Sequence, residues 1–299
     1  MSQVGFVCPD GEKVKFAECN AGCRMGQRCA TRPILKKIQD GVRQWKGKAS
    51  TTQLLNGTMS AYLEIANDWY QSVNAHAFSL LGTLAHEGMD VLTEGCINEH
   101  VFPDLEITGI PDLFQKCEDG SGEYDLYDYK TSGSYKIAKA LGFYKEEEDV
   151  LDDEGNQVLF KSGPRKGQVK TRRVSKFNPA MADLGDWAMQ LNRYRILGEE
   201  NLGIKVRGMY IQSIVRDGGV EIATRRGLEQ NMYIIPVPRL DDLSVKTFYA
   251  AKNKDLHQAL EQGGWATPCN EDERWNDRKC QGYCPVSAHC PHGRVVGGQ

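Results

Sequence analysis

No stretch of this chain approaches the roughly 20 consecutive apolar residues that a membrane-spanning helix needs. Its first residues also lack the basic start and the apolar run that mark a secretory signal. We therefore expect a cytoplasmic protein with no membrane partner. In a reducing compartment, clustered cysteines bind metal more often than they form disulfides.

A strong net charge is also missing, since the formal charge is −3 and the isoelectric point about 6.1. The overall charge therefore gives no argument for or against nucleic acid as a partner. With 299 residues, 40% hydrophobic and 26% charged, the composition is that of an ordinary globular protein with a large core. Positive charge is local: residues 1–48 carry ten Lys or Arg against four Asp or Glu, a local +6. Such a surface fits contact with a phosphate backbone.

A second basic stretch lies between positions 161 and 176, with seven basic residues and no acidic one. We predict that it contacts DNA, with five of its residues in that role: Arg165, Lys166, Lys170, Arg172 and Arg173. The alternative is a solvated, flexible loop. The acidic run at 146–154 bears on this choice, because it could neutralise the basic strip within one hairpin.

Eight of the ten cysteines fall into two sets, one at each end of the chain, that share the spacing C-x10-C-x3-C-x5-C. The sets are Cys8, Cys19, Cys23 and Cys29, and Cys269, Cys280, Cys284 and Cys290. Four thiolates at short spacings are a strong signal for a metal site, zinc or iron–sulfur. Arg24, Arg28 and Arg32 interleave with the first set and are candidate phosphate contacts. The remaining two, Cys96 and Cys117, are expected to be small buried hydrophobic residues.

Hydrophobic periodicity mixes helices and strands throughout the chain. The patterns predict helices from 33, from 51, near 77–92, at 183–197 and at 243–260, and strands at 107–117, 124–131, 206–215 and 232–237. The fold class is therefore α/β or α+β. We predict an N-terminal cysteine module at 1–32, a core at 33–260 with a charged insertion at 135–180, and a C-terminal cysteine module at 261–299.

The two strands around residues 118–122 form a predicted hairpin, since that segment is rich in Gly, Asp and Ser. A turn centred on residue 120 pairs positions that sum to about 240, so Asp112 and Asp128 lie opposite each other. Side chains alternate along a strand, so Lys130 shares a face with Asp128. Two carboxylates that meet need a cation between them, and oxygen ligands suit Mg²⁺ or Mn²⁺. The alternative is an exposed hairpin with solvated charges.

Further markers lie on either side of this hairpin. A segment G-T-L-A-H ends at His86, an aspartate follows G-I-P at position 112, D-Y-K begins at Asp128, and Q-L-N-R-Y runs from Gln190 to Tyr194. In this order the motifs resemble those of the PD-(D/E)XK nuclease superfamily, in its RecB-like branch. The resemblance covers residues 82–194 and implies a restriction-endonuclease-like core with helices around a mixed sheet.

The same resemblance implies a role for each matching residue. Asp112 and Asp128 would be metal ligands together with the Tyr129 carbonyl, and His86 would be a further ligand or would orient one. Lys130 would be the catalytic lysine. Gln190 and Tyr194 would position the substrate strand or the lysine. Glu87 and Thr131 are weaker candidates beside these motifs.

Some RecB-like nucleases, namely the helicase–nuclease AddB and the CRISPR-associated exonucleases, are similar in a further respect. They hold a [4Fe–4S] cluster with one cysteine before the histidine motif and three near the C-terminus. Here Cys29 would join Cys280, Cys284 and Cys290, although the first gap of the triplet is x3 rather than x2 and four cysteines are left over. The matched spacing favours two separate four-thiolate sites over one shared cluster.

Taken together, these patterns predict a DNA nuclease that uses Mg²⁺ or Mn²⁺ to hydrolyse phosphodiester bonds. The resemblance implies an exonuclease that acts on single-stranded or duplex ends in recombination, repair or phage DNA processing, in a bacterial or phage-infected cell, with recombination or replication proteins as partners. The alternatives are a structure-specific endonuclease, a catalytically idle nucleic-acid-binding protein with structural metal clasps, and an iron–sulfur redox protein.

Overall fold

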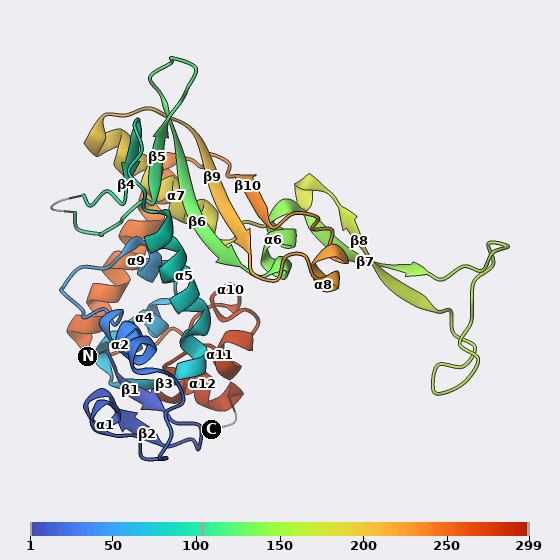
Figure 1. Ribbon diagram of the computed structural model, residues 1–299, viewed down its shortest axis with the longest axis horizontal. Coiled ribbons are helices and arrows are strands. Elements are labelled where there is room, and N and C mark those ends of the chain that lie inside the picture. Colours follow the sequence, from blue (N-terminus) through green and yellow to red (C-terminus); the bar gives the residue numbers. More distant parts are fainter. Residues whose placement is uncertain (1, 103–104, 298–299) are drawn as a thin grey trace.

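The computed structural model describes residues 2–102 and 105–297 of the chain (Figure 1). The outermost residues of both predicted cysteine modules, Met1 and positions 298–299, lie outside this part. The fold is mixed α/β, with three sheets and helices around them. Within the described residues, no helix has both the length and the apolar character that crossing a membrane requires.

The central sheet has five strands in the order β10-β9-β6-β5-β4. Strands β6 and β9 run parallel, and the other neighbours run antiparallel. The strands are β4 (Cys96–Asn98), β5 (Leu113–Lys116), β6 (Tyr124–Ser132), β9 (Val206–Val215) and β10 (Met232–Pro236). Strands β9 and β10 therefore lie within one residue of the bounds that the sequence predicts.

The β5–β6 hairpin has the predicted register. Leu113 lies opposite Tyr127 and Lys116 opposite Tyr124, so paired positions sum to 240. The prediction of a strand from 107 was wrong in its first half. Thr108 instead exchanges backbone hydrogen bonds with Ala49 and Thr51, so this segment pairs outside the hairpin and β5 begins only after Asp112.

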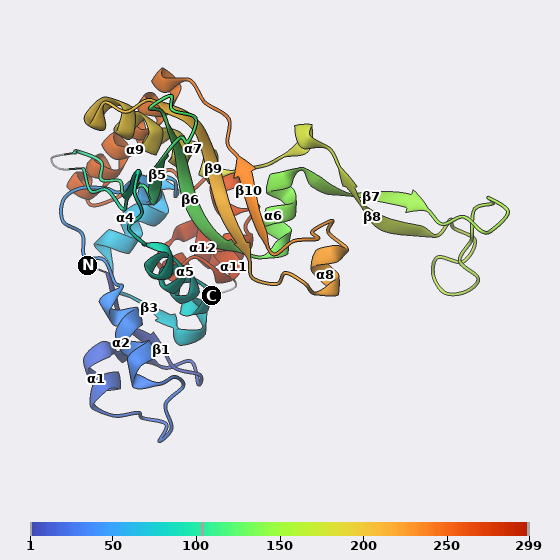
Figure 2. The ribbon, with the colours of Figure 1, turned by 45° about the horizontal axis from the view of Figure 1, so that its top comes forward.

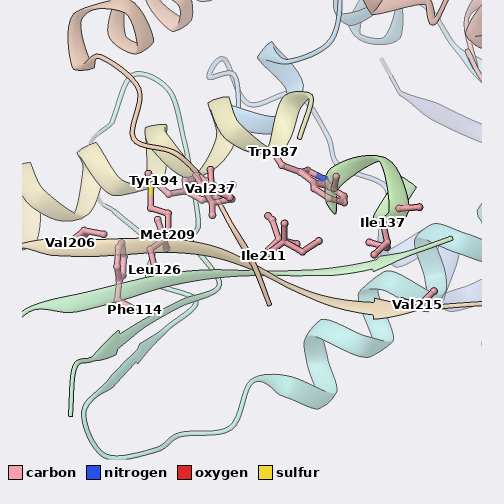
Figure 3. Packing of buried hydrophobic residues seen from close by; sticks show 14 of the residues in the cluster. Phe114, Leu126, Ile137, Trp187, Tyr194, Val206, Met209, Ile211, Val215 and Val237 are labelled. Carbon is pink, nitrogen blue, oxygen red and sulfur yellow. The ribbon is translucent and has the colours of Figure 1, made fainter. Parts of the chain in front are cut away.

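Helix α7 (Asp186–Leu197) covers one face of the central sheet, where Leu126 and Ile211 are completely buried (Figure 3). Burial of such side chains contributes about 1.5–3 kcal/mol each and fixes the helix on the strands. The other face meets α5 (Ala77–Met89), whose Gly82 lies next to Thr131. None of the residues of α5 is buried, so the predicted apolar helix exists but remains at the surface.

A second hydrophobic core lies between α7 and helices from both halves of the chain. It contains Leu54, Ile196, Tyr249 and Leu256. The helices that meet α7 there are α3 (Thr51–Leu54), α4 (Thr58–Ala66) and α9 (Asp242–Gln262). The single helix predicted from residue 51 is in fact two, because the chain leaves the helical conformation before Gly57, the N-cap of α4.

The N-terminal module is a three-stranded sheet in the order β2-β1-β3, with two short helices. Its elements are β1 (Gln3–Val7), β2 (Lys13–Lys15), α1 (Phe16–Ala21), α2 (Arg32–Asp40) and β3 (Trp69–Ser72). Leu35 and Ile38 of α2 belong to its core, so the module extends beyond the predicted boundary at residue 32. The turn η1 (Val73–His76) links it to α5.

The C-terminal cysteine module consists of short helices on the core. They are α10 (Glu271–Arg274), α11 (Arg278–Gly282), η4 (Ser287–His289) and α12 (Pro291–Val296). Two further turns, η2 (Pro179–Met181) and η3 (Gly198–Leu202), flank α7, and α8 (Glu221–Thr224) lies between β9 and β10.

A two-stranded arm projects from the body of the molecule (Figures 1 and 2). It is formed by β7 (Phe143–Asp149) and β8 (Thr171–Phe177). The predicted insertion at 135–180 begins too early, because α6 (Ser134–Leu141) belongs to the main core. Ile137 of this helix is completely buried against the central sheet. The prediction of an insertion used only the polarity of the segment. The buried Ile137 shows that the first part of the segment belongs to the main core.

Candidate functional site

Two of the predicted site residues meet at the start of β5. His86, on the exposed helix α5, places its Nδ1 3.4 Å from Oδ1 of Asp112. The other oxygen of Asp112 accepts a hydrogen bond of 2.6 Å from the backbone N–H of Tyr129, across the hairpin. One carboxylate oxygen is thus fixed by the sheet, and the other is turned toward the imidazole.

The other predicted residues meet one strand further into the sheet. The Asp128 carboxylate forms an ion pair with the Lys130 ammonium, two residues along the same face. Its Oδ1 accepts a hydrogen bond of 3.1 Å from Gln190 Nε2, and the same amide lies 3.3 Å from the Tyr194 hydroxyl. Four side chains from β6 and α7 therefore form one connected polar chain.

Burial changes the protonation of Asp128. Asp128 is 1% exposed, and burial raises its pKa to about 6, with Lys130 opposing the rise and Asp112 adding to it. The hydrogen bond to Asp112 raises the pKa of His86. A buried carboxylate that resists ionisation and a second carboxylate beside it together favour a bound cation.

A residue that the sequence patterns did not single out also lies here. Ligand atoms of Glu99, His86 and Asp112 all lie within 4.8 Å of one another. Glu99 follows β4 and has a positive φ of 43°, which is uncommon for a residue other than glycine. Its N–H donates to the Asp112 carbonyl, so pairing with β5 carries it to the site. No motif in the sequence marks this glutamate, because only the β4–β5 pairing brings it to Asp112.

Gln190 and Tyr194 are buried, whereas contact with a substrate strand would require them to be at the surface. They are 6% and 4% exposed, so neither reaches a bound strand at the surface. Their contacts orient Asp128 instead. The two weaker candidates lie outside the polar chain: Glu87 pairs with Lys37 at the surface, and Thr131 faces α5.

The donor set fits a divalent metal of the Mg²⁺ or Mn²⁺ class. Carboxylate oxygens from Asp112 and Glu99 are ligands that these ions prefer, and the His86 imidazole of the same group suits Mn²⁺ as well. Asp128 is a further carboxylate one strand away and lies outside that group. In the described residues, Asp128 Oδ2 has no hydrogen-bond donor other than its ion-pair partner Lys130. The Tyr129 carbonyl, next to Asp128 on β6, is the further ligand that the family resemblance implies.

The predicted DNA-binding residues divide between two parts of the arm. In its stem, Arg172 and Arg173 lie opposite the acidic strand β7, with ion pairs to Glu148 and Glu147 at 3.9 and 3.2 Å. Near the tip, Arg165, Lys166 and Lys170 are exposed and form no ion pair within the described residues. The two arginines of the stem therefore face acidic partners, whereas the three basic residues near the tip have none within the described residues.

The four cysteines of the first set line one small cavity in the N-terminal module. Two of the three interleaved arginines are engaged within the module. Arg28 donates to the Cys19 carbonyl at 2.6 Å, and Arg24 pairs with Asp10. Only Arg32, at the start of α2, is exposed without such a partner in the described part of the chain.

The second cysteine set lies against helix α4. Cys269, Cys284 and Cys290 pack around Met59, Leu63 and the completely buried Val286. Cys280 lies next to a further group of ligand type, because its sulfur and ligand atoms of Asp277 and His292 are within 4.8 Å of one another. Away from both sets, Cys117 is buried as expected, and Cys96 is half-buried in β4.

Comparison with known proteins leaves the family open. No family model matches the chain, and no curated protein matches it. One solved structure that it is similar to is the crystal structure of SSO0001, with 16% identity and a TM-score of 0.41. The match covers 88% of this chain and 94% of the other. A likeness this loose decides neither the fold family nor the activity.

Proposed function

We propose that this protein is a metal-dependent nuclease that hydrolyses phosphodiester bonds in DNA. The observation that carries the proposal is that two polar pairs, His86 with Asp112 and Asp128 with Lys130, lie within electrostatic reach of each other. His86 lies on α5, Asp112 just before β5 and the other two on β6, yet they share one electrostatic environment, since each aspartate contributes to the pKa of His86. Their order along the chain is that of the RecB-like nucleases.

In this proposal each side chain has a distinct task. A bound divalent ion would polarise a phosphoryl oxygen and lower the pKa of a bound water. Asp112 would hold the ion with one oxygen, while the Tyr129 N–H fixes the other. Gln190 fixes the orientation of Asp128. The Lys130 ammonium, 22% exposed, stabilises the negative charge that develops on the phosphoryl group.

A cleavage assay with matched lysine variants tests the proposal. End-labelled DNA is incubated with the full chain in Mn²⁺ and in Mg²⁺, and products are separated on a denaturing gel. Lys130→Ala should reduce the rate by about 100-fold or more, as expected for loss of a charge at the transition state. Lys116→Ala is the matched control, because it removes an exposed lysine at the far end of the same hairpin.

The same assay separates the proposal from a catalytically idle binding protein. If the wild type leaves DNA intact in both metals, or if Lys130→Ala cleaves as fast as Lys116→Ala, the nuclease proposal is wrong. Binding of DNA without cleavage would then favour the idle nucleic-acid-binding alternative.

The preference for DNA ends rests on the family resemblance and needs a substrate test of its own. A covalently closed circular single strand and its linear form differ only in having ends. An exonuclease degrades the linear form and spares the circle, whereas an endonuclease cuts both. Cleavage of the circle at a comparable rate would favour the endonuclease alternative.

The tip of the arm is the part that we assign to the DNA backbone. Replacing the three tip residues Arg165, Lys166 and Lys170 by alanine should weaken DNA binding and lower its salt dependence, because each lost phosphate contact reduces the slope by about 1. The double variant Arg172→Ala/Arg173→Ala is the control, since its arginines already pair with glutamates. Equal effects of the two variants would contradict this assignment.

A further inference from the structure

The four cysteines of the first set line one common cavity. Cys8, Cys19, Cys23 and Cys29 line a cavity of about 30 Å³ together with apolar side chains of the module. All four cysteines therefore line one common space, as a single ion bound by the whole set requires.

From this cavity we propose that the N-terminal module binds a single zinc ion through these four thiolates, and that this ion holds helix α5 and so positions His86. Four sulfur ligands at short spacings are the donor set of structural zinc sites. On binding, Zn²⁺ replaces the thiol protons, which pass to the solvent. The second half of the proposal rests on the nuclease function proposed above.

The module has little else to stabilise it. Its buried hydrophobic residues are Phe6, Val14, Leu35 and Ile38, a set far smaller than the main core. Units of about 40 residues usually need a metal, disulfides or a partner to remain folded. All four cysteines are free thiols rather than disulfides, so a metal is the cross-link that this chemistry allows.

The zinc site is independent of the C-terminal cysteines. Cys19 lies within electrostatic reach of the other three thiols of its own set. Cys280 has the same relation to Cys269, Cys284 and Cys290. A cluster shared between Cys29 and the C-terminal triplet, as the family resemblance implies, does not fit this arrangement, because Cys29 lines the N-terminal cavity.

Contacts at the end of the module connect it to α5. Val73 packs against the module core, and Gln3 Nε2 lies 3.0 Å from Nε2 of His76, the residue before α5. The ring of Phe6 meets the His76 ring edge-on at 6.4 Å. Because α5 has no buried residue of its own, these contacts in the turn before it help to fix the helix that carries His86.

Metal analysis of the full chain tests the first half. The double variant Cys23→Ser/Cys29→Ser should contain one zinc fewer per chain than the wild type, with the metal content of the C-terminal set unchanged. Cys96→Ser, at a half-buried cysteine outside both sets, should lose nothing. If the variant fails to fold, titration of the wild type with an organomercurial should release one zinc as the four thiols of this set react.

Three results would overturn the zinc site: iron in place of zinc in the first set, no metal lost from the double variant, or loss of the C-terminal metal when Cys29 alone is replaced. The last result would show a shared cluster. None of these outcomes depends on nuclease activity, so they are distinct from failure of the proposed function.

Binding of Mn²⁺ tests the second half. Electron paramagnetic resonance titration should show Mn²⁺ affinity about tenfold weaker in Cys23→Ser/Cys29→Ser than in Cys96→Ser, as for other residues that orient a metal ligand. Asp112→Asn serves as the reference for loss of a direct ligand. Unchanged affinity in a variant that has lost its zinc would overturn the link to His86 and leave the nuclease proposal standing.

Discussion

The two cysteine sets have identical spacing, but the structure places them in different surroundings. The first lines a cavity in a module with its own small core, joined to the rest mainly by β3 and α5. The second packs on α4, where the N–H of Ser60 donates to Cys269 and its hydroxyl lies 3.8 Å from the Cys284 sulfur. The second set therefore packs against a helix of the main body, whereas the first packs within its own module.

The difference shows that the spacing of the cysteines determines the ligand set but not which part of the protein a bound ion stabilises. The spacing specifies a ligand set, because four thiols at these intervals can surround an ion. What the ion stabilises depends on the side chains around it. At the N-terminus that is a module and the turn before α5, and at the C-terminus it is the helix α4 of the main core.

Loss of one thiol should have unequal consequences at the two ends. Cys284→Ser should lower the free energy of unfolding of the whole core by about 4 kcal/mol or more, because metal binding is coupled to folding there. Cys23→Ser should leave the main unfolding transition nearly in place and loosen the N-terminal sheet alone. Urea unfolding followed by circular dichroism, with hydrogen exchange of β1 and α4, measures both. Equal shifts of the main transition would show that the two surroundings are equivalent.

The carboxylate site is a third region in this comparison, because the ionised form of its buried Asp128 destabilises the folded state. The folded-state pKa of Asp128, about 6, lies above its ordinary value of 3.8. The folded state then binds this proton more tightly than the unfolded state does. The stabilisation that this proton gives the folded protein is therefore lost as the pH rises from about 4 through 6. Without metal, the stability of Asp128→Asn relative to the wild type should therefore rise by up to about 3 kcal/mol between pH 4 and pH 8.

Thermal melts in a chelator at several pH values measure this difference. Asp125→Asn is a control, since that aspartate is also buried but pairs with Arg207 away from the site. A difference between Asp128→Asn and the wild type that stays constant with pH would contradict the assignment.

Two glycines test how closely each set is surrounded. A Cβ on Gly57 would lie 2.3 Å from the Cys269 sulfur, whereas a Cβ on Gly22, in the first module, would meet nothing within 4 Å. Gly57→Ala should lower the free energy of unfolding by about 1–3 kcal/mol and weaken metal retention by the second set. Gly22→Ala has an extended backbone and should change stability by less than about 0.5 kcal/mol. Thermal melts and metal analysis report both, and a neutral Gly57→Ala would mean that Cys269 has room to move.

The surface ion pair between Lys37 and Glu87 should have the smallest effect. It joins α2 of the N-terminal module to α5, but both side chains are more than a third exposed. Exposed pairs contribute about 0–1 kcal/mol, so Glu87→Gln should alter Mn²⁺ affinity less than twofold. A larger change would mean that this pair, rather than the packing around His76, connects the module to His86.

Local sequence patterns predicted a large part of the fold for identifiable reasons. Turn residues at 118–122 set the hairpin register, and alternation along β6 placed Asp128 beside Lys130. Strand β9 and helix α9 lie within two residues of the bounds that the sequence predicts. The predictions were wrong where a long-range contact decided the outcome, as for the 107–112 segment that pairs with Ala49 and Thr51, and for α6, held by Ile137.

The sequence by itself determined which chemical groups are present and how they are spaced within each motif. Those properties are local, because a turn, a strand or four cysteines at fixed intervals act over a few residues. The tertiary structure alone decided that Glu99 joins His86 and Asp112, that Gln190 is buried against Asp128, and that equal cysteine sets stand in unequal surroundings. These depend on packing between elements distant in sequence, where burial and pairing set the energy of each group.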